Sequence, residues 1–405
     1  MTYPICSQDG RSGRRRFAAT CLAALIFLTA CDLGVTNPGR IEDDALNVET
    51  AMGPLVTGMA GDFTTVYDEM AYFMAIVSGE TTHSGAFEAE QFMQRGEIEP
   101  RHVNGLWGQL HRARWVAEQG LQRLKTVLGT AYGTSALGAE ANLWAGFANR
   151  ALGENMCVAV YDGGPAEDFK THFTRAQGFF SDALTIAQQV TWTTGTTLRQ
   201  AAYAGRAQVR AALGDWANAA SDAQQVPTNF RYTAIYSAAD SREYNWLHNE
   251  SYARNYYSVW NTYAAALNNT DARMGFTDLK KNGADGKTPM YQQKKYITRD
   301  AAIGIAEWDE MRLIQAEAAL MLTGDVAGAM TLINGVRTAA AVATKAATTV
   351  AQAMTALRQE RDIVLWLEAR HLWDLRRFSD AFLTGRDSCI PASENEVNTN
   401  PNLGS

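Results

Sequence analysis

The chain has 405 residues, of which 46% are hydrophobic and 10% aromatic, and its formal net charge is −7 at pH 7. This is the composition of a folded globular protein with a large core, and the acidic balance without a basic stripe excludes the usual nucleic-acid-binding classes. Motifs for phosphate loops, dinucleotide binding, serine hydrolysis and zinc proteolysis are missing. The six histidines show no ligand spacing. We therefore expect no catalytic residue, no cofactor and no metal.

Residues 1–30 have the pattern of a lipoprotein signal peptide. Four arginines precede an apolar run from Phe17 to Leu28, which suits a signal peptide and is too short to span a bilayer. The small residues before Cys31 resemble a lipobox, so we expect cleavage there and lipid on Cys31. An ordinary signal with an incidental cysteine is the alternative. No later segment is apolar enough to span a membrane, so we expect an anchored protein that does not cross the bilayer.

Helical patterns follow at residues 45–78 and 103–128, with a polar loop from Ser78 to Phe87 between them. Once the leader and Cys31 are set aside, two cysteines remain, Cys157 and Cys389. An oxidising compartment favours a disulfide between them, which would tie the C-terminal tail to the helical body. Two buried free thiols are the alternative.

Three segments of the chain look like weak internal repeats, at 141–153, 201–226 and 312–336. Each places small residues in a helix, followed by a glycine turn and a second helix. Leu213-Gly-Asp and Thr323-Gly-Asp align well, because glycine permits a left-handed helix end and aspartate can cap the next helix. The pattern resembles degenerate tetratricopeptide hairpins, although chance periodicity is the alternative.

The two Gly-Asp turns are much further apart than one tetratricopeptide period, which indicates an insertion at about 227–306. It is rich in aromatic residues interleaved with asparagines. Aromatic faces beside amide and guanidinium groups suit sugars, peptides or other polar nutrients. Packing of the rings onto the helices is the alternative. The candidate ligand-binding residues, chosen on local composition alone, are Trp246, Tyr252, Arg254, Tyr256, Tyr257 and Trp260.

Near the C-terminus, residues 353–378 read as one long amphipathic helix. Its charged residues lie close to a tryptophan-rich face, where they are costly unless paired. Arg370 and Asp374 have the spacing of an i,i+4 pair. We therefore interpret the set as a structural ion-pair network that fixes how the helix docks. The residues of this hallmark are Arg361, Glu368, Arg370, Trp373 and Asp374.

Several of these motifs resemble the SusD/RagB-like nutrient-binding outer-membrane lipoproteins. Leu357-Arg-x-Glu-Arg361 followed by Leu367-Glu-Ala-Arg-His-Leu-Trp-Asp-Leu-Arg-Arg-Phe378 resembles the hallmark helix of that family. The helix pair from Glu310 to Arg337, the Asp271-x-Arg273 motif and the tail from Cys389 to Leu403 also fit, in the expected order.

The resemblance implies a mostly α, SusD-like fold in which tetratricopeptide-like helix pairs form a right-handed superhelix, with an irregular loop-rich lobe. Residues 31–405 would form one domain on the outer membrane, facing outward. The expected function is to bind an oligosaccharide or similar nutrient and deliver it to a SusC-like TonB-dependent barrel. In related proteins, loops near the first helices contribute to binding, which adds Glu80, His83 and Phe87 as candidates.

Two other classes remain open on the sequence. A tetratricopeptide-repeat outer-membrane lipoprotein that scaffolds assembly would account for the lipobox and the helix pairs but not for the aromatic insertion. A surface hydrolase would need a carboxylate pair or a triad in a cleft, and sequence alone cannot bring such residues together.

Overall fold

The computed structural model describes residues 43–403, without the side chains of residues 44 and 192. The predicted leader, Cys31 and the tether that follows lie outside this range. Residues Asp43–Leu46 form a short 3-10 helix, and the chain from Asn47 onward forms a separate compact unit.

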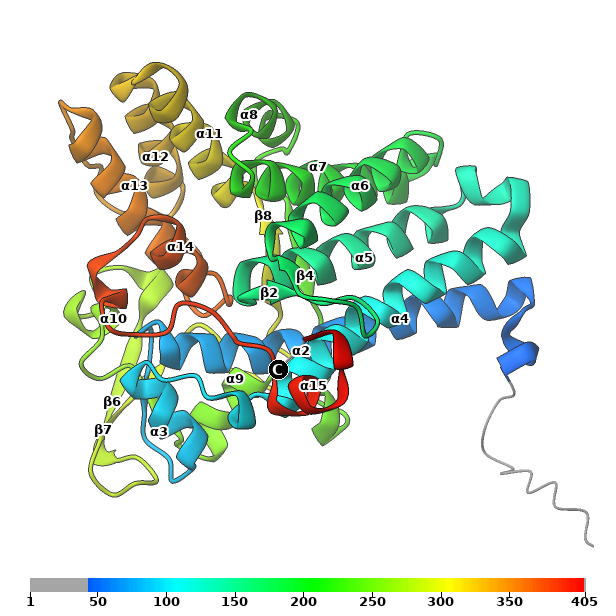
Figure 1. The fold of residues 1–405 in the computed structure, drawn as a ribbon. Helices are drawn as coiled ribbons and strands as arrows, with labels where there is room; N and C mark the ends of the chain where they lie inside the picture. Colours follow the sequence, from blue (N-terminus) through cyan, green and yellow to red (C-terminus); the bar gives the residue numbers. More distant parts are fainter. Residues whose placement is uncertain (1–42, 404–405) are drawn as a thin grey trace, which may run out of the picture. The chain divides into compact units, whose positions relative to one another are not determined.

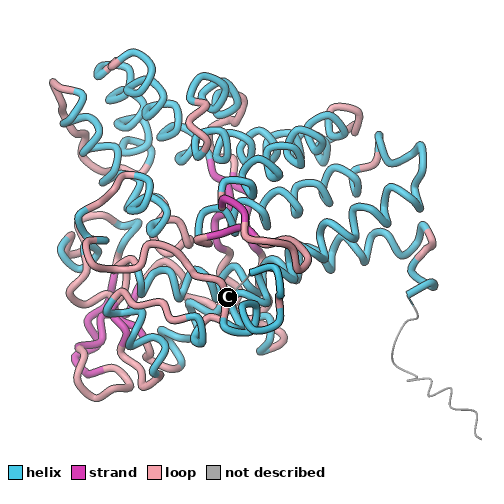
Figure 2. The backbone as a smooth tube through the Cα atoms, in the orientation of Figure 1, coloured by secondary structure: helices cyan, strands magenta, loops and turns pink. Residues whose placement is uncertain are grey.

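Helices dominate the described residues, as the sequence predicts (Figures 1 and 2). Their bounds are α2 Met52–Val77, α3 Glu88–Arg95, α4 Asn104–Leu128, α5 Ala136–Asn155, α6 Lys170–Ala187, α7 Trp192–Ala212, α8 Trp216–Gln224, α9 Trp246–His248, α10 Tyr263–Ala266, α11 Trp308–Thr323, α12 Val326–Ala339, α13 Val350–Val364, α14 His371–Arg377 and α15 Glu394–Thr399. None of the helices in residues 43–403 combines the length and hydropathy needed to cross a bilayer.

The strands within the described residues are short and pair into antiparallel, two-stranded sheets, namely β1 with β5, β2 with β3, β4 with β8 and β6 with β7. Their bounds are β1 Thr82–His83, β2 Val158–Ala159, β3 Glu167–Asp168, β4 Arg231–Ala234, β5 Tyr257–Ser258, β6 Phe276–Asn282, β7 Pro289–Gln293 and β8 Ile303–Glu307.

Successive helices pack on one another: α2 on α4, α4 on α5, α5 on α6, α6 on α7 and α7 on α8 (Figure 1). The series then continues with α11, which packs on α8, α12 and α13. The main core includes Phe63 and Tyr67 of α2, which are almost fully buried. A smaller core among α11, α12 and α13 includes Leu313, Ile333 and Leu357.

Two of the three predicted hairpins are present. Gly214 and Gly324 end α7 and α11 with φ of 80° and 67°, the left-handed conformation that glycine adopts without strain. Asp325 caps α12 by accepting a hydrogen bond from the Gly328 N–H at 2.9 Å. Asp215 does not cap α8, because its carboxylate accepts from Asn218 at 2.9 Å.

The third predicted hairpin, at 141–153, is wrong, because α5 runs through it without a turn. The glycines there serve helix packing. A Cβ at Gly146 would lie 2.6 Å from the Phe180 ring of α6, and one at Gly153 would lie 2.7 Å from Phe173. The missing side chains therefore let two aromatic rings of α6 approach the α5 backbone.

The predicted insertion leaves the helical series after α8 and returns to it at α11. β4 and β8 close its base, with Arg231 opposite Glu307 and Ala234 opposite Ile303. Strands in the insertion also reach the early loop, since Thr82 pairs with Ser258. Two stretches far apart in the sequence are therefore joined at the backbone.

The single helix predicted over 353–378 is wrong, because it is broken between α13 and α14. Leu367 and Ala369 in the break have φ of 60° and 61°. Tertiary contacts replace the lost helical hydrogen bonds. The Leu367 N–H donates to the Glu80 carboxylate at 2.8 Å, and Lys295 Nζ donates to the Trp366 carbonyl at 2.6 Å. Buried backbone N–H and C=O groups need hydrogen-bond partners, and at the break Glu80 and Lys295 supply them.

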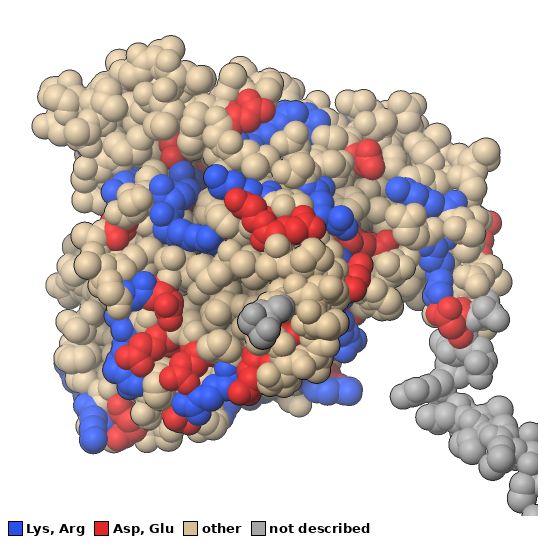
Figure 3. Space-filling model, viewed as in Figure 1, with Lys and Arg blue, Asp and Glu red and all other residues tan. Residues whose placement is uncertain are grey.

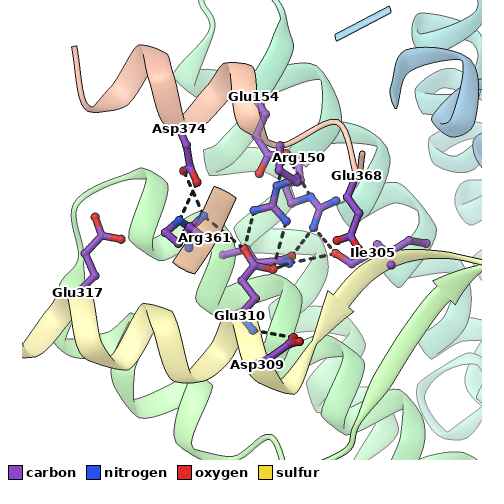
Figure 4. A network of polar contacts seen from close by, with 12 residues as sticks. Arg150, Glu154, Ile305, Asp309, Glu310, Glu317, Arg361, Glu368 and Asp374 are labelled. Carbon is purple, nitrogen blue, oxygen red and sulfur yellow. Dashed lines mark hydrogen bonds and ion pairs between the residues drawn. The ribbon is translucent and has the colours of Figure 1, made fainter. Parts of the chain in front are cut away.

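The hallmark charges form a buried network, although the predicted Arg370–Asp374 pair is wrong. Arg370 donates to Glu310 at 2.7 Å and lies 3.1 Å from the Glu154 carboxylate, while Asp374 accepts from Arg361 at 2.7 Å. Figure 4 shows Glu310, Arg361 and Asp374 directed toward one another. The network joins α5, α11, α13 and α14.

The other two hallmark residues lie at the edges of this network. Trp373 packs on Phe173 of α6, with ring centroids 5.2 Å apart. Glu368 accepts a hydrogen bond from Lys295 at 2.6 Å. Burial raises the pKa of Glu368 to about 8, although the nearby Lys295 cation opposes the rise.

The C-terminal tail is attached to the end of α5. Cys157 and Cys389 are joined by a disulfide. Beside it, the Ile390 N–H donates to the Asn155 carbonyl at 2.7 Å, and the Cys157 N–H donates to the Ile390 carbonyl at 2.9 Å. The tail then leads to α15, which lies against α4 (Figure 1).

Candidate functional site

A hollow of about 430 Å³ lies between α2, α4 and the first part of the insertion. We call it the Trp246 hollow. Its lining combines apolar and aromatic side chains with polar and charged ones. Its lining residues are Gly61, Thr64, Thr65, Asp68, Glu69, Gln109, Ile235, Tyr236, Ser237, Ser241, Arg242, Glu243, Tyr244 and Trp246.

Trp246 is placed at the start of α9 by its neighbour Asn245. The buried Asn245 side chain accepts from the His248 N–H at 2.9 Å, which caps α9, and it donates to the Ala301 carbonyl at 2.6 Å. The Trp246 N–H donates to the Asp68 carboxylate of α2 at 2.7 Å. The backbone is thus fixed from both sides, while 36% of the Trp246 residue surface stays exposed.

Asp68 is the buried anchor of the hollow. It accepts hydrogen bonds from the N–H groups of Trp246 and Glu69 at 2.7 and 2.8 Å. Burial nevertheless raises the pKa of Asp68 well above its ordinary value, because the charged form loses water, although these hydrogen bonds oppose the rise. The neutral carboxyl is therefore favoured over a wider pH range than in an exposed aspartate.

The remaining polar groups can donate and accept hydrogen bonds. Gln109 of α4 donates to Glu69 at 3.0 Å. Arg242 is mostly exposed and pairs with Asp240 at 2.7 Å. The Tyr236 hydroxyl donates to the Thr64 carbonyl at 3.1 Å, which joins the insertion to α2. Apolar and aromatic surface next to such groups is the composition of a small-molecule binding site.

Two other predicted residues, Arg254 and Tyr256, form a separate cluster with Phe87 of the early loop. The Arg254 guanidinium lies 4.1 Å from the Tyr256 ring centroid and 5.4 Å from that of Phe87. Phe87 is 47% exposed. The Ser84 N–H donates to the Tyr256 carbonyl at 2.8 Å, so the two loops are fixed together. This cluster does not line the Trp246 hollow.

The other predicted rings lie elsewhere. Tyr252 stacks on His248 with centroids 4.7 Å apart, and its hydroxyl donates to the Gln293 carbonyl. Trp260 is 37% exposed but does not line the Trp246 hollow. Tyr257 requires a correction. It is fully buried and its hydroxyl donates to the Leu247 carbonyl, so it belongs to the core and presents no surface to a ligand.

The early-loop candidates are similarly divided. Glu80 is fully buried and serves the break between α13 and α14. His83 is buried too, and burial lowers the pKa of His83 to about 4. Only Phe87 of these three is exposed.

Sequence reasoning missed the half of the hollow that α2 and α4 contribute. Gly61, Thr64 and Glu69 belong to a helix whose pattern indicates only a buried face, and they precede Trp246 by more than 170 residues. No short motif marks them. The exposed Ile235 and Arg242 lie in the predicted insertion, but they are not aromatic, and aromatic composition was the signal used to predict ligand-binding residues there.

Comparisons of the sequence and of the structure with known proteins both find similarity to SusD-like proteins. The SusD family model matches residues 218–402. A laminarin-binding SusD-like protein has a similar structure, with a TM-score of 0.72, 13% identity and coverage of 88% of this chain and 98% of the other. A SusD superfamily protein from Bacteroides vulgatus has a TM-score of 0.69 and 15% identity, with coverage of 88% of this chain and 98% of the other. A SusD/RagB family protein from Bacteroides thetaiotaomicron has a TM-score of 0.65 and 12% identity, with coverage of 85% of this chain and 94% of the other.

No curated protein matches the chain in sequence. Identities this low establish the fold, while the family model supplies the sequence evidence. The resemblance that the C-terminal motifs predicted is confirmed, as is the mostly α, SusD-like fold.

Proposed function

Because residues 218–402 match the SusD family and the described chain has the SusD-like fold, we propose that this protein captures nutrients at the cell surface. It binds an oligosaccharide or a comparable nutrient and delivers it to a SusC-like TonB-dependent transporter of the outer membrane. No bond is broken in the process. The Trp246 hollow is the binding site.

The observation that carries this proposal is the partly exposed Trp246 ring, which lines the hollow. Its backbone is held by Asp68 and Asn245, so the indole is presented without large motion. Preorganised aromatic surface beside hydrogen-bonding groups favours binding of sugars, because less ordering is needed when the ligand arrives. A protein of the same fold is named for laminarin binding, which supports a glycan as the ligand class.

The membrane part of the proposal rests on the N-terminal sequence. Residues 1–30 are removed as a lipoprotein signal, and lipid on Cys31 anchors residues 31–405 to the outer membrane, facing outward. This segment forms one domain, with its ligand lobe in the insertion at about 227–306. Lipid chains on one cysteine give stable anchoring when more than one is attached.

Ligand binding is tested by affinity electrophoresis in gels that contain laminarin, amylopectin or xylan. We expect at least one of them to retard the wild-type protein and Trp246→Ala to weaken the retention about tenfold or more, as for a buried tryptophan anchor at an interface. Leu322→Ala is the matched control, since Leu322 is 54% exposed on α11 and lies outside the hollow. Equal retention of Trp246→Ala and wild type would reject this hollow as the site.

Delivery is tested by a mild-detergent pull-down of the tagged protein from its native outer membrane. We expect a TonB-dependent barrel to co-purify in stoichiometric amount, and Cys31→Ala to leave the membrane fraction. Recovery of barrel-assembly proteins instead would favour an assembly scaffold. Membrane association of Cys31→Ala without any barrel would contradict the anchored-uptake proposal.

A further inference from the structure

A second hollow, of about 400 Å³, also borders α4 but is closed by different segments. These are the loop after β2 and the C-terminal helix α15, which packs against α4 (Figure 1). We call it the Trp115 hollow. Its chemically informative lining residues are Trp107, His111, Arg112, Trp115, Asp162 and Glu396.

Three rings of this hollow form a stripe along α4. Trp107, His111 and Trp115 are spaced by four residues, which places them on one face of the helix. Trp107 is buried and packs on His111 with centroids 4.4 Å apart. Trp115 is 49% exposed, the largest fraction of any aromatic side chain that the structure describes. The Trp115 ring therefore presents a large aromatic surface to the hollow that it lines.

Polar groups surround the exposed ring. The side chains of Arg112 and Asp162 are 69% and 57% exposed, and Glu396 is half-buried. His111 Nε2 has no hydrogen-bond partner among the described residues. Burial, together with the nearby Arg114 cation, lowers the pKa of His111 to about 3, so its imidazole is neutral near pH 7. The combination suits a neutral, hydroxyl-rich ligand.

The two hollows meet at α4. Gln109 lines the Trp246 hollow, whereas its neighbour Gly108 and Arg112 one turn later line the Trp115 hollow. Arg112 also pairs with Asp62 of α2 at 2.8 Å, which lies next to Gly61 of the first hollow. A Cβ added at Gly108 would meet no heavy atom within 4 Å. At Gly108 the ridge between the hollows therefore carries no side chain, and the ridge is about one helix wide, ~10 Å.

On the premise of the proposed glycan binding, we propose that the Trp115 hollow is a second saccharide subsite. A glycan chain that occupies the Trp246 hollow crosses α4 at Gly108 and places a distal sugar on the Trp115 ring. Short saccharides fill only one hollow at a time. Long chains engage both, and the second contact is intramolecular, which raises the overall affinity.

The test compares chain lengths on matched variants. Wild type, Trp115→Ala, Gly108→Gln and the control Leu322→Ala are run in gels containing laminarin, amylopectin or xylan. The polysaccharide that retards wild type is then compared with its own trisaccharide by calorimetric titration. Gly108→Gln fills the ridge, and because glycine is a poor helix former the helix should not be weakened. Circular dichroism checks the fold of each variant.

We expect Trp115→Ala and Gly108→Gln each to weaken polysaccharide binding about tenfold or more while the trisaccharide affinity changes by less than about twofold. Trp246→Ala should weaken both. If Trp115→Ala and Gly108→Gln bind the polysaccharide like wild type while Trp246→Ala does not, the second subsite is rejected and the proposed function stands. If none of the three polysaccharides or their trisaccharides binds wild type, the glycan premise fails and the subsite with it.

Discussion

At the scale of single residues, the Trp246 hollow depends on one buried carboxyl group. The Asp68 carboxylate of α2 accepts a hydrogen bond from the Trp246 N–H and is buried. If the side chain is truncated, the N–H loses its partner. We therefore expect Asp68→Ala to lower the free energy of unfolding by ~1–3 kcal/mol, the cost of an unsatisfied buried group, and to weaken ligand binding.

Asp68→Asn should behave differently, and its effect should depend on pH. The pKa of Asp68 is raised in the folded protein above the ordinary value of 3.8, chiefly by burial. A raised carboxyl pKa means that the folded state holds the proton more tightly, so the contribution of Asp68 to stability is full below about pH 4 and declines as the pH rises toward the folded pKa. Asparagine keeps an oxygen acceptor and carries no charge.

The stability of Asp68→Asn relative to wild type should therefore increase from about pH 4 to pH 8. Urea denaturation of both proteins across this range measures the difference, in which other titrating groups cancel. A difference that stays constant with pH would show that the Asp68 pKa is not raised. If the glycan gel retards Asp68→Asn as much as wild type, the hollow is intact in the variant.

At the scale of elements, the two Gly-Asp turns offer a matched comparison. Asp325 caps α12 through the Gly328 N–H at 2.9 Å, whereas Asp215 accepts from Asn218 and does not cap α8. We expect Asp325→Ala to lower the free energy of unfolding by ~1 kcal/mol, as for other lost N-caps. Asp215→Ala should have a smaller effect.

Thermal and urea unfolding of the two alanine variants decide the comparison. Both substitutions remove the same charge from the start of a helix, so a general effect of charge on the helix dipole would act on both. Equal losses would therefore show that the cap geometry of Asp325 contributes nothing of its own.

These turns also show which parts of the fold were predictable. Gly214 and Gly324 end helices through local backbone conformation, which a sequence pattern reports directly. Gly153 lies in a similar small-residue pattern, but its role is to let the Phe173 ring of another helix pack closely on the backbone. The break at Leu367 was not predictable either, because its apolar spacing continues and only distant partners such as Glu80 stabilise it.

The candidate site was predictable only in part for the same reason. Local composition identified the aromatic insertion, and Trp246 within it lines the hollow. Composition could not separate Trp246 from Tyr257, since exposure is decided by packing against α2 and the early loop. The polar wall contributed by Thr64 and Glu69 required the tertiary structure.

At the scale of the whole molecule, the hallmark charges connect helices that are far apart in the sequence. Arg370 contacts Glu154 of α5 and Glu310 of α11, at 3.1 and 2.7 Å. Acidic and basic side chains are interspersed on the face in Figure 3, but exposed pairs of this kind are worth little. The buried network is where a lost partner should matter, because the remaining charge cannot reach water.

We expect Arg370→Met to lower the free energy of unfolding by ~3–5 kcal/mol, since it removes the nearest cation from the buried Glu154 and Glu310. The cations that remain, Arg150 beside Glu154 and Arg361 beside Glu310, are each 3.7 Å away. Arg242→Met, which removes an arginine from an exposed pair with Asp240, should cause no measurable change. Adding Glu154→Gln and Glu310→Gln to Arg370→Met should recover part of the loss, because neutral amides can be buried at lower cost than carboxylates. Urea denaturation measures all three variants. Two results would contradict this account: Arg370→Met as stable as Arg242→Met, or no recovery from the two amides. In either case the network would not serve to keep buried carboxylates paired, and packing of the arginine side chain would have to account for its burial.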